Sequence, residues 1–338
     1  MSFTSSDIGY MRRAIQLARN GRGHVSPNPM VGAVIVSPDG RIIGEGWHRR
    51  FGGPHAEVNA VNSVAETDAE LLPLSTIYVT LEPCSHYGKT PPCARLLIEK
   101  RLGRVVVGSG DPNPKVAGRG IAMLRQAGIT VDEHCLEEEC VGLNRMFMTA
   151  HTLHRPFVTL KWACSADGYM DVRREPDAPS FRFSNARGIQ TVHWRRAVHD
   201  AIAVGASTAL ADDPGLDTRF FDGASPRPVI FDRHGLVADG SCRLTRRSDL
   251  LRIGSEPLGE ALRRMYADEG ITSLLVEGGA GLLGSFISSG MWDEAWVEVC
   301  PVCLGDSGRV RTPALPLMPM SAENMGDNVL LHYLNKGC

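Results

Sequence analysis

Apolar positions in the first half of the chain recur at helical spacing in some segments and in short strand-like runs in others. Ile8, Met11 and Ile15 fall on one face of a helix predicted over residues 7–20, with Ser5 or Ser6 as its cap. The pattern predicts further helices over residues 55–61, 91–100 and 137–149, and strands over residues 31–36, 41–46, 75–80 and 105–108. The order is therefore helix, hairpin, helix, strand, helix, strand, helix, which predicts a layered α/β domain.

The pattern breaks at residues 151–156, and a second alternating series follows. It predicts helices over residues 192–198, 257–267 and 278–287, and strands over residues 157–163, 201–205, 228–232, 272–277 and 294–299, the last being the final strand. The polar, proline-bearing residues 173–180 predict a flexible loop. We therefore expect an α/β protein of two three-layer domains, residues 1–150 and 151–338, each with its own sheet.

The first domain contains residues suited to binding a metal. His55 lies two residues before Glu57, and Cys84 and Cys93 lie in the run Glu-Pro-Cys-Ser-His-Tyr-Gly-Lys-Thr-Pro-Pro-Cys. One imidazole and two thiolates form the ligand set of a catalytic zinc, which keeps its fourth position for water and lowers the pKa of that water. His55 and Cys93 would each open a helix, whose dipole favours a thiolate. Glu57 can serve such a water as a general acid and base without binding the metal.

Other interpretations of these residues remain open on the sequence alone. A structural zinc would call for a fourth protein ligand, and His86 is the nearest candidate. The two cysteines can also be core residues, with the His-x-Glu pair occurring by chance. The corresponding functional alternative is a zinc-stabilised binding module without catalytic activity.

Composition and charge narrow the range of partners. The 338 residues are enough for two domains, and the hydrophobic content of 43% and charged content of 22% are ordinary globular values. A net charge of -2 offers no basic surface for nucleic acid. The chain has no apolar signal run or membrane-length segment, and its nine irregularly placed cysteines favour reduced thiols in a cytoplasmic protein. We therefore expect a small-molecule partner and neither nucleic acid nor membrane, while the oligomeric state stays open and includes a homo-oligomer.

The His-x-Glu pair followed by Pro-Cys-x8-Cys resembles the zinc nucleoside and nucleobase deaminase superfamily. Eight residues separate the cysteines here, whereas the general signature has two, and the longer run is similar to one branch, the riboflavin-biosynthesis deaminases. The resemblance implies a cytidine-deaminase-like fold, zinc as the metal, and the three ligands and proton shuttle named above.

The same resemblance implies residues that contact the deaminase substrate. These are Asn28, His48 and Lys89, because an amide can pair with a pyrimidine edge while His48 or Lys89 can meet a phosphate or carbonyl. From the residues alone, Asn28 could equally shape a turn between prolines and His48 could be a surface residue. Residues 111–120 also resemble a loop of the family, and we expect them to lead into a helix near the rim of the pocket.

Two glycine-bearing turns follow strands in the second domain. Gly279-x-Gly281-x-x-Gly284 opens a helix directly after a strand, a context in which free backbone N–H groups can hold phosphates. The pattern alone is weak, because glycines also permit close packing of a helix on a sheet, and its late place in the domain argues against a standard Rossmann fold. Residues 204–214 form a second turn after a strand. Two such turns suit a dinucleotide lying across the sheet edge.

Three motifs of this half resemble the reductase domain of bifunctional riboflavin-biosynthesis proteins. They are Lys161-x-Ala163-x-Ser165-x-Asp167-Gly168, Ala209-Leu210-Ala211-Asp212-Asp213-Pro214 and Val276-Glu277-Gly278-Gly279. The resemblance implies a dihydrofolate-reductase-like fold and NADPH as cofactor. It assigns NADP contacts to Cys164, Thr208, Asp212, Gly279, Ala280, Gly281, Leu282, Leu283, Gly284 and Ser285.

It also assigns contacts with the ribose phosphate of the substrate to Arg196, Leu216, Arg219 and Glu277. Arginines suit a phosphate and Glu277 suits a sugar hydroxyl, whereas a plain surface position is the alternative for both arginines. One departure stands out: many family members carry Trp-Ile-Thr or Trp-Ile-Ser after the flexible loop, and this chain has Arg-Phe-Ser-Asn at residues 182–185. An aromatic contact with the nicotinamide is therefore not implied at that position.

Taken over nearly its whole length, the chain resembles a bifunctional deaminase–reductase of riboflavin biosynthesis. The resemblance implies zinc-dependent hydrolytic deamination of 2,5-diamino-6-(5-phosphoribosylamino)pyrimidin-4(3H)-one, followed by NADPH reduction of the ribosyl group to a ribityl chain. The deaminase chemistry follows from the residues, whereas the substrate and the reduction rest on the resemblance. The alternative is a zinc deaminase whose second domain only binds a nucleotide or mediates dimerisation.

Overall fold

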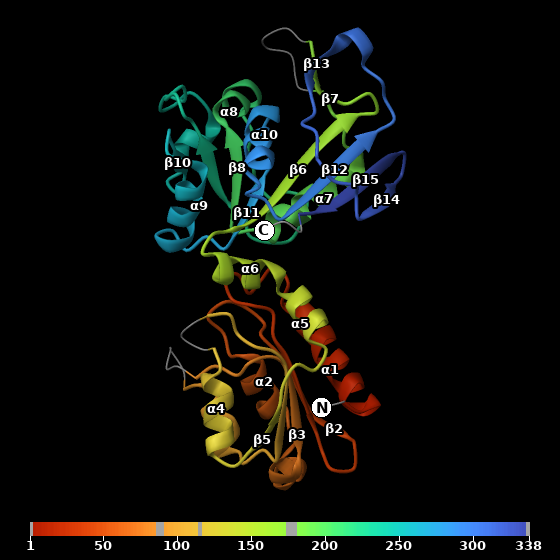
Figure 1. The fold of residues 1–338 in the computed structure, drawn as a ribbon, viewed down its shortest axis with the longest axis vertical. Coiled ribbons are helices and arrows are strands. Elements are labelled where there is room, and N and C mark those ends of the chain that lie inside the picture. The colour runs from red at the N-terminus through yellow and green to blue at the C-terminus, as the bar shows by residue number, and fades with distance from the viewer. Residues whose placement is uncertain (1–2, 86–90, 114–116, 174–180, 336–338) are drawn as a thin grey trace. The chain divides into compact units, whose positions relative to one another are not determined.

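The computed structural model describes residues 3–85, 91–113, 117–173 and 181–335. The chain divides into two compact units, residues 1–153 and 154–338 (Figure 1). Each unit has buried hydrophobic clusters of its own. Among the described residues, no helix combines the length and the apolar content needed to cross a bilayer.

The first unit is built on a five-stranded sheet of order β2-β1-β3-β4-β5. The strands are β1 Gly32–Val36, β2 Ile42–Trp47, β3 Thr76–Leu81, β4 Arg104–Ser109 and β5 Thr130–Asp132. β1 runs antiparallel to both β2 and β3, whereas β3, β4 and β5 are parallel. The α-helices are α1 Ser5–Ala18, α2 Ala56–Asn62, α3 Cys93–Glu99, α4 Arg119–Gln126, α5 Glu137–Leu143 and α6 Arg145–Leu153, and the 3-10 helices are η1 Arg19–Gly21 and η2 Glu66–Leu74.

Helices cover both faces of this sheet. The core under α2, α3 and α4 includes Ala60, Leu97 and Leu124, packed on strand residues such as Ile77 and Val105. A second cluster lies on the other face, under α1 and α5. Figure 1 shows α1 and α5 on one side of the sheet and α2 and α4 on the other. The unit therefore has three layers, as the strand and helix order predicted.

The structure corrects three details of the first unit. Thr4 caps α1 through a capping box with Asp7, so neither Ser5 nor Ser6 is the cap. The helix predicted over residues 137–149 is two helices, which meet at Asn144. The amide of Asn144 accepts a hydrogen bond from the Met30 N–H at 2.8 Å and donates one to the Met30 carbonyl at 2.8 Å. Strand β5 was not predicted, because its three residues are too short for alternation to be visible.

The second unit is built on an eight-stranded sheet of order β10-β9-β8-β11-β6-β12-β15-β14. Its strands are β6 Phe157–Ser165, β8 Ala201–Gly205, β9 Arg227–Phe231, β10 Leu251–Ile253, β11 Ser273–Val276, β12 Glu294–Cys300, β14 Ser321–Met325 and β15 Asn328–Leu334. A separate ribbon pairs β7 Tyr169–Val172 with β13 Gly308–Arg311. The helices are α7 Ala186–Ala197, α8 Ala206–Asp212, α9 Leu258–Ala267 and α10 Ala280–Ser289, with 3-10 helices η3 Arg243–Arg246 and η4 Gly305–Ser307.

Neighbouring strands from β10 to β12 are all parallel, and β15 and β14 complete the sheet in antiparallel fashion. Residues from α9 and α10 pack on one face of the sheet, and residues from α8 pack on the other. Figure 1 shows β6 and β12 side by side in the middle of the sheet. This parallel arrangement brings the carboxyl ends of six strands, β10, β9, β8, β11, β6 and β12, to one edge.

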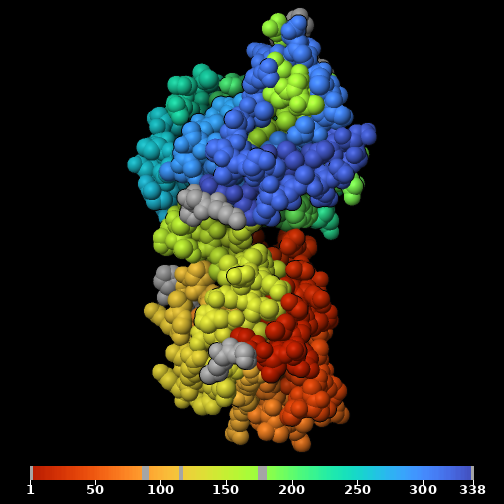
Figure 2. Space-filling view, turned by 45° about the vertical axis from the view of Figure 1, so that its right-hand side comes forward, coloured from red at the N-terminus to blue at the C-terminus, as the bar shows by residue number. Residues whose placement is uncertain are grey.

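The prediction that residues 294–299 form the final strand is wrong, because β13, β14 and β15 follow. β14 is an exposed edge strand on the surface of its unit (Figure 2). Four of its five residues are exposed, so it lacks the apolar alternation by which a half-buried strand is recognised. The helix predicted over residues 192–198 begins earlier, at Ala186, where the Asn185 side chain accepts a hydrogen bond from the Gly188 N–H.

Candidate metal site and nucleotide cleft

Three donor atoms of the predicted metal ligands converge in the first unit. His55 is the N-cap of α2, Cys93 is the first residue of α3, and Cys84 lies in the turn after β3. The His55 Nδ1 atom lies 3.6 Å from the Cys84 Sγ and 3.3 Å from the Cys93 Sγ, and all three atoms are within 4.8 Å of one another. The backbone N–H of Cys93 also donates to the Cys84 sulfur at 3.2 Å. One nitrogen and two sulfurs around a common centre fit the ligand set of zinc.

The electrostatics of the cluster favour a thiolate. A hydrogen bond with Cys93 lowers the pKa of Cys84 to about 4, and a hydrogen bond with Cys84 raises the pKa of His55 to about 9. The pKa of Cys93 rises, because it hydrogen-bonds to the Cys84 sulfur and is buried. The lowered pKa of Cys84 favours the thiolate, the form in which a cysteine binds a metal.

Glu57 lies in the first turn of α2, immediately beside the cluster. Its side chain is buried, at 3% exposure. Burial raises the pKa of Glu57 to about 6, and the negative charge of Cys84 acts in the same direction. A carboxylate tuned towards neutral pH beside the donor atoms can both accept and release a proton.

The structure brings Asn28 and His48 to the same place. The Asn28 Nδ2 lies 3.2 Å from the His48 Nε2, and the His48 Nδ1 lies 3.0 Å from the Pro54 carbonyl oxygen. The His48 ring packs edge-on against the His55 ring, with 5.5 Å between ring centroids. His48 is buried, and burial lowers its pKa, so the alternative that His48 is a surface residue is wrong.

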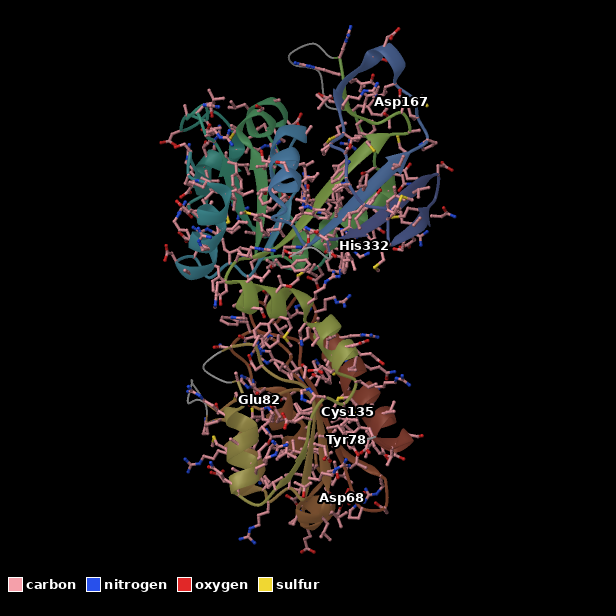
Figure 3. The ribbon with its side chains drawn as sticks, in the orientation of Figure 1. Asp68, Tyr78, Glu82, Cys135, Asp167 and His332 are labelled. Atoms are coloured by element: carbon pink, nitrogen blue, oxygen red, sulfur yellow. The ribbon has the colours of Figure 1, made fainter. Side chains whose placement is uncertain are left out.

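Lys89 and His86 lie outside the described residues, and so does part of the loop over residues 111–120. Glu82 (Figure 3) is a residue for which no role was predicted. Its buried carboxylate accepts hydrogen bonds from the N–H groups of Gly118 at 2.9 Å and Gly120 at 3.0 Å. Glu82 thereby ties the turn that carries Cys84 to the start of α4. Its place two residues before Cys84, a predicted ligand, was the only signal of this role in the sequence.

The second unit carries a cleft of about 910 Å³ at the carboxyl ends of its parallel strands. The cleft is lined at the ends of β8, β9 and β11 by Gly205, Phe231 and Glu277, respectively. The β7–β13 ribbon contributes Asp171 and Arg309 to the lining. A cleft of this size at this edge of a parallel sheet suits a nucleotide cofactor.

Most of the residues predicted to contact NADP line this cleft. They are Thr208, Asp212, Gly279, Ala280, Gly281, Leu282 and Ser285. The Thr208 Oγ1 accepts a hydrogen bond from the Gly279 N–H at 3.0 Å, which joins the two glycine-bearing turns. Cys164, Leu283 and Gly284 do not line the cleft, and the side chains of Cys164 and Leu283 are buried in the core.

The residues predicted to contact the substrate ribose phosphate differ in whether they reach the cleft. Arg196 and Glu277 form a buried two-pronged ion pair, with N–O distances of 3.0 and 2.7 Å. Burial acts to raise the pKa of Glu277, but the charge and hydrogen bond of Arg196, together with the charges of Lys161 and His193, lower that pKa. Only Glu277 of the set lines the cleft; Leu216 is buried, and Arg219 is exposed and pairs with Asp217 at 2.8 Å.

Lys161, which the resemblance included only as part of a motif, also lines the cleft. Burial lowers the pKa of Lys161, while the charge of Glu277 opposes this shift. Phe181 lines the cleft as well, and its ring lies 4.8 Å from that of Phe183. The aromatic ring at this part of the cleft therefore comes from the residue just before the segment that departs from the Trp-Ile-Thr pattern.

Comparisons with known proteins agree with this division. The family model described as the cytidine and deoxycytidylate deaminase zinc-binding region matches residues 4–109, and the one described as the RibD C-terminal domain matches residues 156–330. The riboflavin biosynthesis protein RibD of Actinobacillus pleuropneumoniae is 38% identical, over 98% of this chain and 96% of the relative.

Solved structures show the same likeness over the whole chain. The structure of Acinetobacter baumannii RibD is 32% identical with a TM-score of 0.88, and covers 97% of this chain and 98% of its own. A diaminohydroxyphosphoribosylaminopyrimidine deaminase/5-amino-6-(5-phosphoribosylamino)uracil reductase from Thermotoga maritima is 35% identical with a TM-score of 0.84, at the same coverage. The expected fold class, a cytidine-deaminase-like part followed by a dihydrofolate-reductase-like part, is confirmed. The chain therefore belongs to the RibD family, the bifunctional deaminase and reductase of riboflavin biosynthesis.

Proposed function

We propose that this chain catalyses two successive reactions. The first unit deaminates 2,5-diamino-6-(5-phosphoribosylamino)pyrimidin-4(3H)-one by hydrolysis, and the second reduces the ribosyl group of the product to a ribityl chain with NADPH. The observation that carries the proposal is the convergence of His55, Cys84 and Cys93 beside the buried carboxylate of Glu57. The Thermotoga maritima relative, named for both activities, supports the choice of substrate.

In the first unit, His55, Cys84 and Cys93 would hold Zn²⁺. Bound zinc supplies a water of lowered pKa at its fourth position. Glu57 is not needed as a ligand, so its carboxylate is free to take the proton of the attacking water and to deliver it to the ring nitrogen and the departing ammonia.

The pyrimidine would lie against Asn28. The His48 Nδ1 faces the Pro54 carbonyl, and its Nε2 faces the Asn28 amide, so the orientation of that amide is fixed before the substrate arrives. A preset amide can pair with a ring edge, which carries both donors and acceptors. Lys89 remains the predicted partner of the phosphate.

In the second unit, the two turns joined by Thr208 and Gly279 would hold the phosphates of NADPH, because backbone N–H groups at helix starts bind anions. The nicotinamide would then lie towards β6, where Lys161 and Glu277 line the cleft. The ion pair with Arg196 holds the carboxylate of Glu277 in one orientation, ready to accept a ribose hydroxyl. Arg196 therefore positions Glu277, and its charge is not free for the substrate phosphate.

The deaminase assignment is tested with Glu57→Gln. We expect ammonia release from the diaminopyrimidine substrate to fall by about 100- to 10,000-fold, because the proton shuttle is lost. Zinc content should stay at the wild-type level, since no ligand is changed. Glu66→Gln, on the exposed 3-10 helix η2, is the matched control. Full turnover by Glu57→Gln would remove Glu57 as the proton shuttle, whereas absence of ammonia release by the wild-type protein itself would support a zinc-stabilised module without catalysis.

The reductase assignment is tested by mixing the wild-type protein with the deaminated product and NADPH. We expect the near-ultraviolet absorbance of NADPH to decrease and a ribityl product to form. If NADPH binds but its absorbance stays constant, the alternative is correct and the second unit only binds a nucleotide.

A further inference from the structure

We propose that Glu298 is a positioning residue for the reduction: its buried carboxylate fixes residues 183–185 and thereby holds the Phe181 ring in the wall of the cleft. This inference rests on the proposed reductase function and adds to it a residue that does not itself line the cleft. It is carried by the hydrogen bonds of the carboxylate, by the contacts that join residues 183–185 to the cleft, and by the place of Glu298 on β12.

The carboxylate of Glu298 is buried within the second unit and has two side-chain partners. Glu298 is only 1% exposed. Its Oε2 accepts a hydrogen bond from the Ser184 hydroxyl, and its Oε1 accepts one from the Asn328 amide at 2.6 Å. A Cβ atom on Gly188 would collide with the same carboxylate, so the first turn of α7 packs directly against it. Because a buried carboxylate is costly unless hydrogen bonds satisfy it, Glu298 holds these partners in place.

The backbone around Ser184 is fixed by the hairpin of β14 and β15. The Asn328 Nδ2 also donates a hydrogen bond to the Phe183 carbonyl at 2.9 Å. The Asn185 Nδ2 donates to the Met325 carbonyl, while the Asn185 Oδ1 caps α7. The segment of residues 183–185 is therefore anchored to β12, β14 and β15 at once.

Two aromatic rings connect this anchored segment to the cleft. The Phe183 ring is buried, and its centroid lies 4.8 Å from that of the Phe181 ring. Phe181 lines the cleft and is 37% exposed, so its position depends on the buried ring against which it packs. If the anchor were loosened, Phe181 would lose its fixed position, and a ligand in the cleft would have to order it on binding.

Glu298 lies at the cleft end of its strand. It pairs in register with Ala163 of β6, which lines the cleft, and it lies on the same face of the sheet as Lys161. Burial lowers the pKa of Lys161, and the charges of Glu277 and Glu298 oppose that shift. Glu298 is therefore close enough to the cleft to influence it, although its side chain is turned towards α7.

The kinetic test compares Ser184→Ala with Thr159→Val in the full chain. Each removes a hydroxyl that donates to a buried glutamate of β12, Ser184 to Glu298 and Thr159 to Glu294 at the other end of the strand, at 3.0 Å. The Thr159 hydroxyl also lies 2.9 Å from His199, so the control is at least as disruptive. We expect Ser184→Ala to lower kcat/KM for the reduction about 5- to 30-fold, mainly through KM, and Thr159→Val to change it less than about 2-fold. Urea denaturation of both variants measures the loss of stability, which a purely structural role would link to the loss of activity.

Hydrogen exchange of the backbone amides reports on the anchor without any turnover. We expect Ser184→Ala, and Glu298→Leu more strongly, to speed exchange in residues 181–188, because the segment opens more often. Glu298→Gln should keep the wild-type pattern, since its amide can accept from Asn328 and donate to Ser184. Thr159→Val should leave exchange in this segment unchanged.

Three results would overturn the inference. If Ser184→Ala and Thr159→Val change kcat/KM equally, or neither changes it, Glu298 contributes only to stability, while the reductase proposal stands. If exchange in residues 181–188 stays at the wild-type rate in Ser184→Ala and Glu298→Leu, the segment is held by other means. If the wild-type protein itself does not oxidise NADPH with the deaminated product, the reductase proposal fails and this inference fails with it.

Discussion

At the scale of single residues, Glu82 shows how one side chain can organise a metal site that it does not touch. Its carboxylate holds the N–H groups of Gly118 and Gly120, and it stands two residues before Cys84. The contact is close: a Cβ atom on Gly120 would lie 1.9 Å from the Pro83 carbonyl oxygen, so only glycine fits there. The turn between Glu82 and Cys84 is therefore held by the hydrogen bonds of Glu82 and by the close contact between Pro83 and Gly120.

Glu82→Gln should weaken zinc binding. The amide NH₂ would face a backbone N–H, so one of the two anchors is lost and Cys84 is less well held. We expect the zinc affinity, measured by competition with a chelator, to fall by about 10- to 100-fold. Glu99→Gln, on the exposed side of the helix that begins at Cys93, should leave the affinity unchanged. Equal affinities for Glu82→Gln and wild type would show that the turn is held by other means.

The set of candidate ligands that converge in the structure could be predicted from the sequence because their signal is local. His55 and Glu57 are two residues apart, and Cys84 and Cys93 lie in one short run. Pairings between distant positions carry no such signal. Glu82 meets residues 36 to 39 positions later, and Arg196 meets Glu277 across 81 positions, so only the fold brings them together.

At the scale of elements, α1 is tied to the sheet by a buried carboxylate. Asp7 accepts hydrogen bonds from Thr4, from the Tyr78 hydroxyl on β3 at 2.8 Å and from Arg104 on β4 at 2.7 Å. Burial acts to raise the pKa of Asp7, but these hydrogen bonds hold it well below its usual value. Tyr78 lies at the centre of the unit, where the network joins helix and strands (Figure 3).

This network makes the stability of α1 depend on pH. Because the pKa of Asp7 is lower in the folded state, its contribution is complete above the unfolded value of about 4 and declines as the pH falls below it. Asp7→Asn should lower the free energy of unfolding at neutral pH by about 1 to 3 kcal/mol. The difference from wild type, measured by urea denaturation at several pH values, should shrink in acid.

Asp68→Asn provides the comparison for this prediction. Asp68 forms an ion pair with the half-exposed Arg41 at 2.8 Å on the surface of the unit, so its removal should change stability less. A difference between wild type and Asp7→Asn that stays constant from neutral to acid pH would contradict the role given to the Asp7 charge.

Elements with a strong apolar period could be predicted, and those without one could not. α9 and the buried strands β8 and β11 show continuous or periodic apolar positions. β5, β10 and β13 are short, and β14 is mostly exposed. The break at Asn144 was missed because the residues on both sides favour a helix, and the reason for the break is the Met30 backbone, which is distant in sequence.

At the scale of the whole molecule, each unit has its own sheet and core, so each should fold alone. We expect separately expressed fragments 1–153 and 154–338 to be folded and to keep their own ligands. Zinc should copurify with the first fragment only. NADPH should raise the Tm of the second fragment only, because a ligand stabilises the state that binds it.

The intact chain, which should show both effects, is the control for the fragments. Should either fragment be recovered only as an aggregate, while the intact chain is soluble, the two units would depend on each other for folding. Binding of NADPH to the first fragment would likewise contradict the assignment of the cleft.

The place of β6 in its sheet also bears on how the protein is made. β6 is the first strand of its unit to leave the ribosome, yet its neighbours in the sheet are β11 and β12. Phe157 can pair with Ser273 of β11 only after β11 has been synthesised. Thr159 can pair with Glu294 of β12 only after β12 has been synthesised. During that interval the nascent chain exposes Val158, Leu160 and Trp162 on a strand with two open edges, where other unfinished chains can pair. We therefore expect molecular chaperones to protect β6 while the rest of this unit is being synthesised.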